Sequence, residues 1–529
     1  MHSQCMLYAN AFFNDLDCYE NNKGMYKGGG FILSKGQEQW SSRWGFIAAS
    51  IGMAIGTGNI WRFPRVAAAN GGGPFIIAWT IALFTWGIPL LMAEMVIGKK
   101  TGYGAIAGFR DFLGKKFTWM GTWIVGVCLL IMFYYSVVMG WCMKYFTLAL
   151  TGAFTPNSTT EMTTVIWNTF TTTPSETILF HFISMSVATI IIYKGVSGGI
   201  EKASKIMIPL LFVLLIGAFL RAVTLPGALQ GLQYLFNPDI SMLSNPKIWL
   251  EAFTQCAWST GAGWGFIITY AVYTHEKEDI PCNCAIMGFG NNVGALLAGV
   301  TVMSAIFALS PSADFAGEVL SAGNSGLTFI YLAQLFTTMP FGQVVAAIFF
   351  LAMTIAALSS LLPMIEVGVR AFMDAGFNRA KATLIVTGGG FLLGIPSAYS
   401  LNILDNQDWV WGVALLVSGL FVAIAMINYG PEKIRTEVIN APWSDLKVPK
   451  WWTYSMYMIP VIFVILTGWW MWQASTWSPD TWLDPKEVFG VGTILVQFAM
   501  LLTFAIATNK IFAKKSHNRN AGDMEGAIE

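Results

Sequence analysis

The chain contains about twelve apolar stretches that are each long enough to cross a lipid bilayer as a helix. Within the hydrocarbon core, only helices and closed barrels satisfy their own backbone hydrogen bonds. Hydrophobic residues make up 55% of the 529 residues and charged residues 11%, whereas soluble domains carry about 25% charged residues. We therefore predict an all-α membrane protein with transmembrane helices near residues 44–70, 74–98, 118–150, 178–194, 203–223, 248–274, 281–309, 341–373, 381–400, 409–429, 452–474 and 488–512.

Lysine and arginine fall on alternate loops between these stretches. The loops after even-numbered spans are basic, with Lys99 and Lys100 after the second span and Lys433 and Arg435 after the tenth. By contrast, residues 151–177, 310–340 and 397–409 contain no lysine or arginine. Because cytoplasmic loops carry the excess of positive charge, we expect both termini in the cytoplasm, with the chain in the plasma membrane or the bacterial inner membrane.

The polar ends of the chain suggest three parts. Residues 1–39 are predicted to form a cytoplasmic N-terminal tail, residues 40–512 the membrane core, and residues 513–529 a cytoplasmic C-terminal tail. Within the core, residues 310–340 are too mixed for a span, and we expect an extracellular loop with short helices at Phe315–Leu320 and Leu327–Phe336.

The composition excludes several classes of function. A net charge of +1 with no basic patch argues against a nucleic-acid partner. The seven cysteines do not form a pattern that predicts a disulfide framework. The sequence contains neither a P-loop nor a His-x-x-His pair, so neither ATP hydrolysis nor metal-dependent catalysis is predicted.

Two of the predicted spans contain clusters of glycine. They lie at Gly52–Asn59 in the first span and at Gln255–Gly265 in the sixth. Each glycine costs a helix interior about 1 kcal/mol relative to alanine, so the clusters predict unwound segments. At membrane depth such backbone survives only where it lines a cavity or binds ions or a ligand. Close helix packing through small residues is the alternative, but the polar residues Asn59, Arg62 and Ser259 favour a binding site.

Several sequence runs carry a resemblance to a known family, the neurotransmitter:sodium symporters, including their bacterial amino-acid members. The runs are GMAIGTGNIWRFP at Gly52–Pro64, NGGGPF at Asn70–Phe75, GIPLLMAE at Gly87–Glu94, Tyr134-Tyr135 and the sixth-span cluster. The resemblance extends from about Trp40 to the C-terminus. It implies the leucine-transporter fold, with spans 1–5 and 6–10 as inverted repeats, unwound first and sixth helices, and spans 11 and 12 as accessory helices.

The resemblance also implies a function. It predicts a symporter that imports a neutral amino acid with sodium by alternating access, and no enzymatic activity. A receptor or sensor that binds the amino acid without net transport is the alternative, because a fold does not fix a function. Membrane lipid is the expected surrounding partner, and the sequence leaves open whether the chain forms a homodimer.

Two sodium sites follow from the resemblance. The first would use Ala54, Asn59, Ser259 and Asn291 together with the substrate carboxylate. The second would use the carbonyl groups of Gly52, Ile55 and Ala356 and the hydroxyl groups of Ser359 and Ser360. For this serine pair, hydrogen bonding back to the helix is the alternative. The two asparagines are harder to explain as packing, since an amide at membrane depth is costly without a partner.

The same resemblance gives a substrate pocket. Its residues would be Ala54, Gly56, Thr57, Gly58, Ile131, Tyr135, Trp258, Ser259, Gly261, Trp264, Ser360 and Met364. Monoamine carriers of the family have an aspartate at the position of Gly56, so its absence favours a zwitterionic amino acid. Trp264 replaces a common phenylalanine and favours a small or medium neutral side chain. Thr57 replaces a common leucine.

Gates would close the pocket at both ends. Arg62 and Asp408 would form the outer gate, and Asp374 with Tyr273 and Trp40 the inner gate. Two departures from the family concern the gates and ions. The inner-gate arginine is Gln37 here, with Lys35 as a candidate replacement. Ala295 and Trp79 stand at positions that hold chloride ligands in the family, so chloride dependence stays open.

Overall fold

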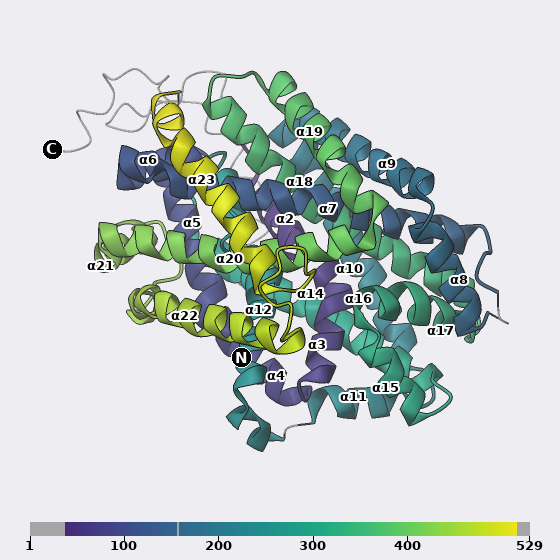
Figure 1. Ribbon diagram of the computed structural model, residues 1–529. Coiled ribbons are helices and arrows are strands. Elements are labelled where there is room, and N and C mark those ends of the chain that lie inside the picture. Colours follow the sequence, from purple (N-terminus) through teal and green to yellow (C-terminus); the bar gives the residue numbers. More distant parts are fainter. Residues whose placement is uncertain (1–37, 156–157, 238, 516–529) are drawn as a thin grey trace. The chain divides into compact units, whose positions relative to one another are not determined.

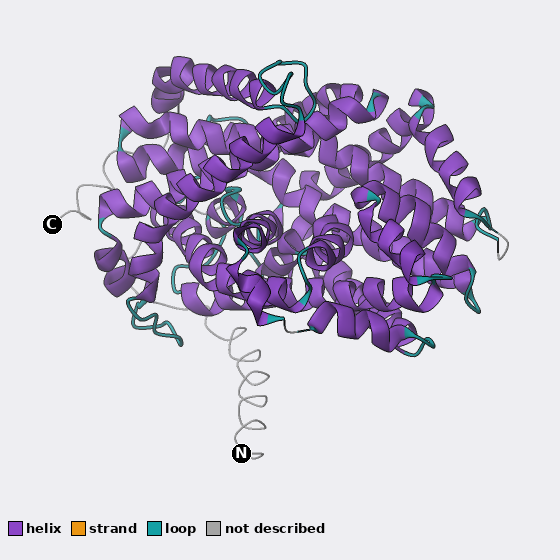
Figure 2. Ribbon diagram, turned by 60° about the horizontal axis from the view of Figure 1, so that its bottom comes forward, coloured by secondary structure: helices purple, strands orange, loops and turns teal. Residues whose placement is uncertain are grey.

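A computed structural model describes residues 38–155, 158–237 and 239–515, and this part of the chain contains helices and no strands (Figure 2). Ten helical segments in it are long and apolar enough to cross a membrane. In chain order they are α4 (Gly73–Ala82) with η2 (Leu83–Gly87) and α5 (Ile88–Thr101), α7 (Thr118–Leu150), α9 (Pro174–Tyr193), η4 (Val196–Glu201) with α10 (Lys202–Val223), α14 (Ile280–Leu309), α18 (Gly342–Asp374), α19 (Arg379–Tyr399), α20 (Leu401–Tyr429), α22 (Trp451–Trp477) and α23 (Val491–Lys515).

The first and sixth predicted spans are interrupted helices, as the glycine clusters predicted. The first consists of α2 (Arg43–Ala54), η1 (Gly58–Arg62) and α3 (Phe63–Ala69), and the sixth of α12 (Pro246–Ser259) and α13 (Phe266–Ala271). The sixth span is broken where Gly261, Gly263 and Gly265 adopt positive φ angles of 73°, 91° and 77°, which other residues rarely adopt. With the ten continuous segments, these two account for the twelve predicted spans.

The interrupted spans lie within the bundle of continuous helices. α2 packs against α10, α14 and α18, while α12 packs against α4 and α20, and α13 against α5 and α18. The two interrupted spans also touch each other, because α12 contacts η1 and α13 contacts α2. In Figure 1 the purple helices α2 and α3 accordingly lie among helices from later in the chain.

Shorter helices fill the connections. They are α6 (Ala105–Leu113), η3 (Lys115–Phe117), α8 (Thr160–Thr171), α11 (Ala228–Phe236), η5 (Ile240–Ser244), α21 (Pro431–Ile434) and η7 (Arg435–Ile439). The segment 310–340 holds α15 (Ala313–Ser321), α16 (Gly323–Ser325), η6 (Gly326–Leu332) and α17 (Ala333–Thr337). The two short helices predicted in this loop are therefore confirmed.

Candidate binding site for sodium and substrate

A buried carboxylate of α5 accepts hydrogen bonds from backbone amides at the break in the sixth span. Glu94 is fully buried, and its Oε1 accepts a hydrogen bond of 2.6 Å from the Gly263 amide. Its Oε2 accepts a second, of 3.4 Å, from the Ile268 amide. Amide groups at a helix break have no partner within their own helix, and lipid cannot supply one. Glu94 therefore replaces lost helix bonds and stabilises the unwound segment.

Two half-helices end at the predicted first sodium site. α2 ends at Ala54 and α12 ends at Ser259, so both direct carbonyl oxygens of their last turns toward this region. The C-terminal end of a helix carries partial negative charge, and two such ends favour a cation between them. The structure thus places the negative ends of both interrupted spans beside each other.

Asn291 of α14 joins the two half-helices. One end of its amide lies 2.7 Å from Asn59 Nδ2, and the same end lies 2.9 Å from the Ser259 carbonyl oxygen and 3.2 Å from the Ala54 carbonyl oxygen. If this end is the oxygen, three acceptors face one another and a cation would stabilise them. If the amide is rotated, its nitrogen donates to both carbonyls instead. All four residues predicted for this site therefore meet. The carbonyl oxygens of Ala54 and Ser259 and the side-chain oxygen of Asn291 suit a hard cation such as sodium, whereas Asn59 turns its amide nitrogen toward Asn291 and its oxygen toward the Gly56 amide.

Four of the five residues predicted for the second sodium site also lie together, namely Gly52, Ile55, Ala356 and Ser359. Ser359 Oγ donates to the Ala356 carbonyl at 2.9 Å and lies 3.5 Å from the Ile55 carbonyl, at the end of α2. Gly52 is next to them, because a Cβ atom added there would lie 3.2 Å from Ser359 Cβ. Ser360 points elsewhere and donates to the Met53 carbonyl at 3.2 Å. The bond to Ala356 is also the one expected from a helix serine that bonds back to its own helix.

A cavity of about 460 Å³ adjoins the first of these sites. Ten of the twelve predicted substrate residues line it, namely Ala54, Gly56, Thr57, Gly58, Tyr135, Trp258, Ser259, Trp264, Ser360 and Met364. Two predicted residues do not line it. Ile131 is fully buried on α7, and Gly261 faces the ring of Phe266 and the methyl group of Met53. Because Ala54, Asn59 and Ser259 belong to both, the cavity and the ion site share residues.

The chain matches the Sodium:neurotransmitter symporter family over residues 37–176 and 176–514. It belongs to this family. An uncharacterized sodium-dependent transporter of Methanocaldococcus jannaschii is 33% identical over 79% of this chain and 87% of its own length. The uncharacterized sodium-dependent transporter YhdH of Bacillus subtilis is 31% identical over 81% of this chain and 96% of its own length.

Among solved structures, this symporter is similar to MhsT in complex with L-phenylalanine. The two share 31% sequence identity with a TM-score of 0.72, over 82% of this chain and 99% of MhsT. The likeness confirms the predicted all-α leucine-transporter fold. With the family, it also confirms that the chain is a sodium-dependent transporter and not an enzyme.

Aromatic side chains form the apolar wall of the symporter's cavity. The Trp264 ring packs 5.0 Å from Phe266 and 5.7 Å from Trp258, measured between ring centroids. The sequence analysis missed Phe266. It also missed Gly412 of α20, which lines the cavity and lies so close to the Trp258 indole that any added Cβ atom would overlap the ring. A single glycine within an apolar helix gives no sequence signal of such a contact.

The predicted outer-gate residues line the same cavity without a direct ion pair between them in the described chain. Arg62 Nη1 donates to Gln255 Oε1 at 2.5 Å, and Arg62 Nη2 lies 3.7 Å from Glu251 Oε2. Asp408 is on the cavity wall, together with Asp405. Arg62 is therefore held by α12 in this conformation, and Glu251 is a partner that sequence reasoning missed.

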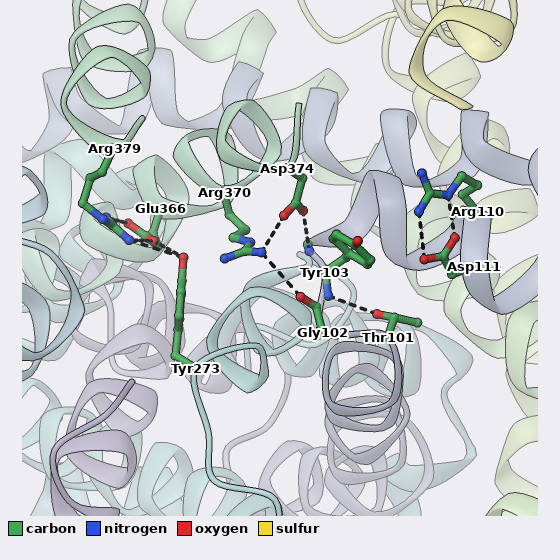
Figure 3. Close-up of polar contacts among 11 residues, drawn as sticks. Thr101, Gly102, Tyr103, Arg110, Asp111, Tyr273, Glu366, Arg370, Asp374 and Arg379 are labelled. Carbon is green, nitrogen blue, oxygen red and sulfur yellow. Dashed lines mark hydrogen bonds and ion pairs between the residues drawn. The ribbon is translucent and has the colours of Figure 1, made fainter. Parts of the chain in front are cut away.

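Asp374 and Tyr273 of the predicted inner gate belong to two polar networks at α18, and the Arg370 guanidinium of the first lies 5.5 Å from the centre of the Tyr273 ring in the second (Figure 3). Asp374 forms an ion pair of 2.6 Å with Arg370, one turn earlier in the same helix, and accepts a hydrogen bond of 2.8 Å from the Gly104 amide. The Tyr273 hydroxyl donates to Glu366 at 2.6 Å, and Nη1 and Nη2 of Arg379 each donate to the Glu366 carboxylate at 2.8 Å. Sequence reasoning missed Arg370, Glu366 and Arg379.

The residues just before α2 form hydrogen bonds with other parts of the bundle, including Tyr273. The Trp40 amide donates to the Tyr273 carbonyl and Trp40 Nε1 to the Tyr270 carbonyl, both at 3.0 Å. The buried Glu201 carboxylate accepts hydrogen bonds from Ser41 and Ser42. Gln37 and Lys35, the residues in question for the inner-gate arginine, lie outside the described residues, as do most of the predicted tails.

Proposed function

We propose that this symporter imports a neutral α-amino acid together with sodium by alternating access. One observation carries the proposal: the first ion site and the cavity are built from the same residues, Ala54, Asn59 and Ser259. An ion held there would face the carboxylate of an amino acid in the cavity. Each would then raise the affinity of the other, which is the linkage that coupled transport needs.

The charge of the cavity supports a zwitterionic ligand. The lining residues around the break, from Met53 to Asn59, include no acid, and Gly56 supplies no side chain at all. The acidic residues of the cavity, Asp405 and Asp408, lie on α20 instead, and the arginines Arg62 and Arg65 line the same cavity. An isolated amine would find no carboxylate at the break, whereas a carboxylate would find amide groups and the sodium ion.

The aromatic wall supports a neutral side chain. Trp258, Trp264, Phe266 and Met364 surround the part of the cavity beside the break. A charged side chain among them would lose its hydration without gaining a partner. MhsT, which was solved with L-phenylalanine, shows a related chain with a neutral amino acid.

The proposal extends to the ions and the orientation. The clusters around Asn291 and around Ser359 support two sodium ions for each transport cycle. The basic loops after even-numbered spans support cytoplasmic termini in the plasma membrane or bacterial inner membrane, with residues 40–512 as the transport core.

Uptake into proteoliposomes tests the proposal. With sodium outside and potassium inside, labelled neutral amino acids should accumulate above the external concentration, and accumulation should stop when choline replaces sodium. Sodium-dependent binding without accumulation would instead identify a receptor or sensor. Uptake that is equal in sodium and choline would refute sodium coupling for the amino acid.

A further inference from the structure

Thr57 makes two hydrogen bonds to one tyrosine at the break of the first span. Its amide donates to the Tyr135 hydroxyl oxygen at 3.3 Å, and its side-chain hydroxyl donates to the same oxygen at 3.2 Å. Tyr135 comes from the continuous helix α7, and both residues line the cavity. The side chain of Thr57 therefore makes a hydrogen bond to Tyr135 that a leucine at this position could not make.

The two bonds fix the direction of the tyrosine proton. A phenolic oxygen has two lone pairs and one proton. Since Thr57 donates to the oxygen twice, both lone pairs are used, and the Tyr135 proton has to point away from Thr57. The oxygen lies close to Gly56, because a Cβ atom added to Gly56 would be 3.1 Å from it. The missing side chain of Gly56 leaves space beside this hydroxyl and the Ser360 hydroxyl, which such a Cβ atom would approach to 2.8 Å.

The family resemblance implies that the Tyr135 hydroxyl meets the substrate carboxylate, and we propose that the Thr57 hydroxyl is a positioning group that holds Tyr135 as the donor in that contact. The Thr57 amide donates to Tyr135 through a long bond of 3.3 Å, so an arriving carboxylate competes with Tyr135 for this amide. When that amide turns to the carboxylate, the bond from the Thr57 hydroxyl still holds Tyr135. A bond from a hydroxyl to a carboxylate is stronger than one between neutral groups, which gives selectivity for a carboxylate over a neutral amide. The inference rests on the proposed amino-acid transport.

The test uses an isosteric pair of variants. Thr57→Val removes the hydroxyl and keeps the shape, while Thr57→Ser keeps the hydroxyl. The ligands are the best transported of the twenty common L-amino acids and its primary amide, which lacks the carboxylate charge. We expect Thr57→Val to raise the KM for the amino acid about fivefold, the effect of one hydrogen bond, with little change in maximal rate. The preference of the Thr57→Val protein for the amino acid over the amide should fall by the same factor. Thr57→Ser should recover most of the affinity for the amino acid and most of this preference.

A second variant shows whether Thr57 acts through Tyr135. In a Tyr135→Phe background the hydroxyl is gone, so Thr57→Val should have no further effect on KM. Additive effects of the two substitutions would overturn the inference, and so would a Thr57→Val protein with unchanged KM or with equal losses for both ligands. If the unmodified protein takes up none of the amino acids, the proposed function itself fails, and that result is seen before any variant is compared.

Discussion

Asn59 Nδ2 lies 2.7 Å from the amide of Asn291, and this contact joins the interrupted first span to the continuous helix α14. Because the same Asn291 amide reaches the ends of α2 and α12, it connects three elements at one point. A sodium ion bound there would hold both half-helices against α14. Sodium binding and closure of the cavity are therefore expected to be linked through this asparagine pair.

Replacing Asn59 by alanine should weaken sodium binding without unfolding the protein. The substitution removes a proposed ligand of the ion and leaves Asn291 with one partner fewer. A hydrogen bond or ligand contact to a charged group is worth about 1.5–3 kcal/mol, so the sodium concentration for half-maximal uptake should rise roughly tenfold or more. Asn168→Ala, on the exposed side of α8, is the matched control. An unchanged sodium titration of Asn59→Ala would rule out this residue as a ligand.

Replacing Trp264 by phenylalanine should admit larger substrates. Trp264 lines the cavity and packs against Trp258 and Phe266, so a smaller ring leaves space on the ligand side. A difference of one methylene group in such a pocket is worth about 1–3 kcal/mol, so preference between a larger and a smaller amino acid should shift roughly tenfold. Competition of unlabelled amino acids against uptake measures the shift, with Trp472→Phe on the exposed face of α22 as control. If unlabelled amino acids compete in the same order in Trp264→Phe and in Trp472→Phe, Trp264 contributes only to packing.

Replacing Gly412 by alanine should impair transport by displacing Trp258. The added methyl group would overlap the Trp258 indole, which has to tilt into the cavity or away from α20. We expect a reduced maximal uptake rate and a changed KM, measured in proteoliposomes. Gly217→Ala is the matched control, since a Cβ atom on Gly217 of α10 meets nothing within 4 Å. If both variants transport alike, the contact between Gly412 and Trp258 has no part in the cycle.

Replacing Asp408 by asparagine should slow transport more than it weakens binding. In this conformation Arg62 is paired with Glu251, while Asp408 lines the same cavity. If closure brings Asp408 to Arg62, the loss of its charge removes an attraction of the closed state and lowers the maximal uptake rate severalfold. Glu251→Gln, which removes a partner of the present conformation, should not produce the same loss. Wild-type uptake by Asp408→Asn would remove Asp408 from the gate.

The interruptions could be predicted from the sequence because glycine clusters and buried asparagines are unusual in a membrane helix. Asn59, Asn291 and the cavity residues on the two broken spans were placed by the resemblance, and the structure brings them together. Contacts that depend on how continuous helices pack could not be predicted in this way. Glu94 stands within a recognised run, but its bonds to the Gly263 and Ile268 amides require knowing that α5 lies beside the break.

The contacts of the gate residues also depend on how the helices pack, so most of them could not be predicted from the sequence. Arg62 of η1 pairs with Glu251 of α12, and spacing within one helix cannot predict a pair between two helices. Arg370 and Asp374 are one turn apart, and that spacing alone could have indicated their ion pair. The Glu366 network needs Tyr273 and Arg379 from two other segments, which only the packed structure shows.

The affinity for the amino acid as a function of sodium concentration tests the shared ion and ligand site most directly. Equilibrium binding of the labelled amino acid to purified protein should tighten at least tenfold as sodium replaces potassium at constant ionic strength. The affinity for sodium should rise by the same factor when the amino acid is present, because linkage is reciprocal. Equal binding of the amino acid in sodium and in potassium would contradict the account.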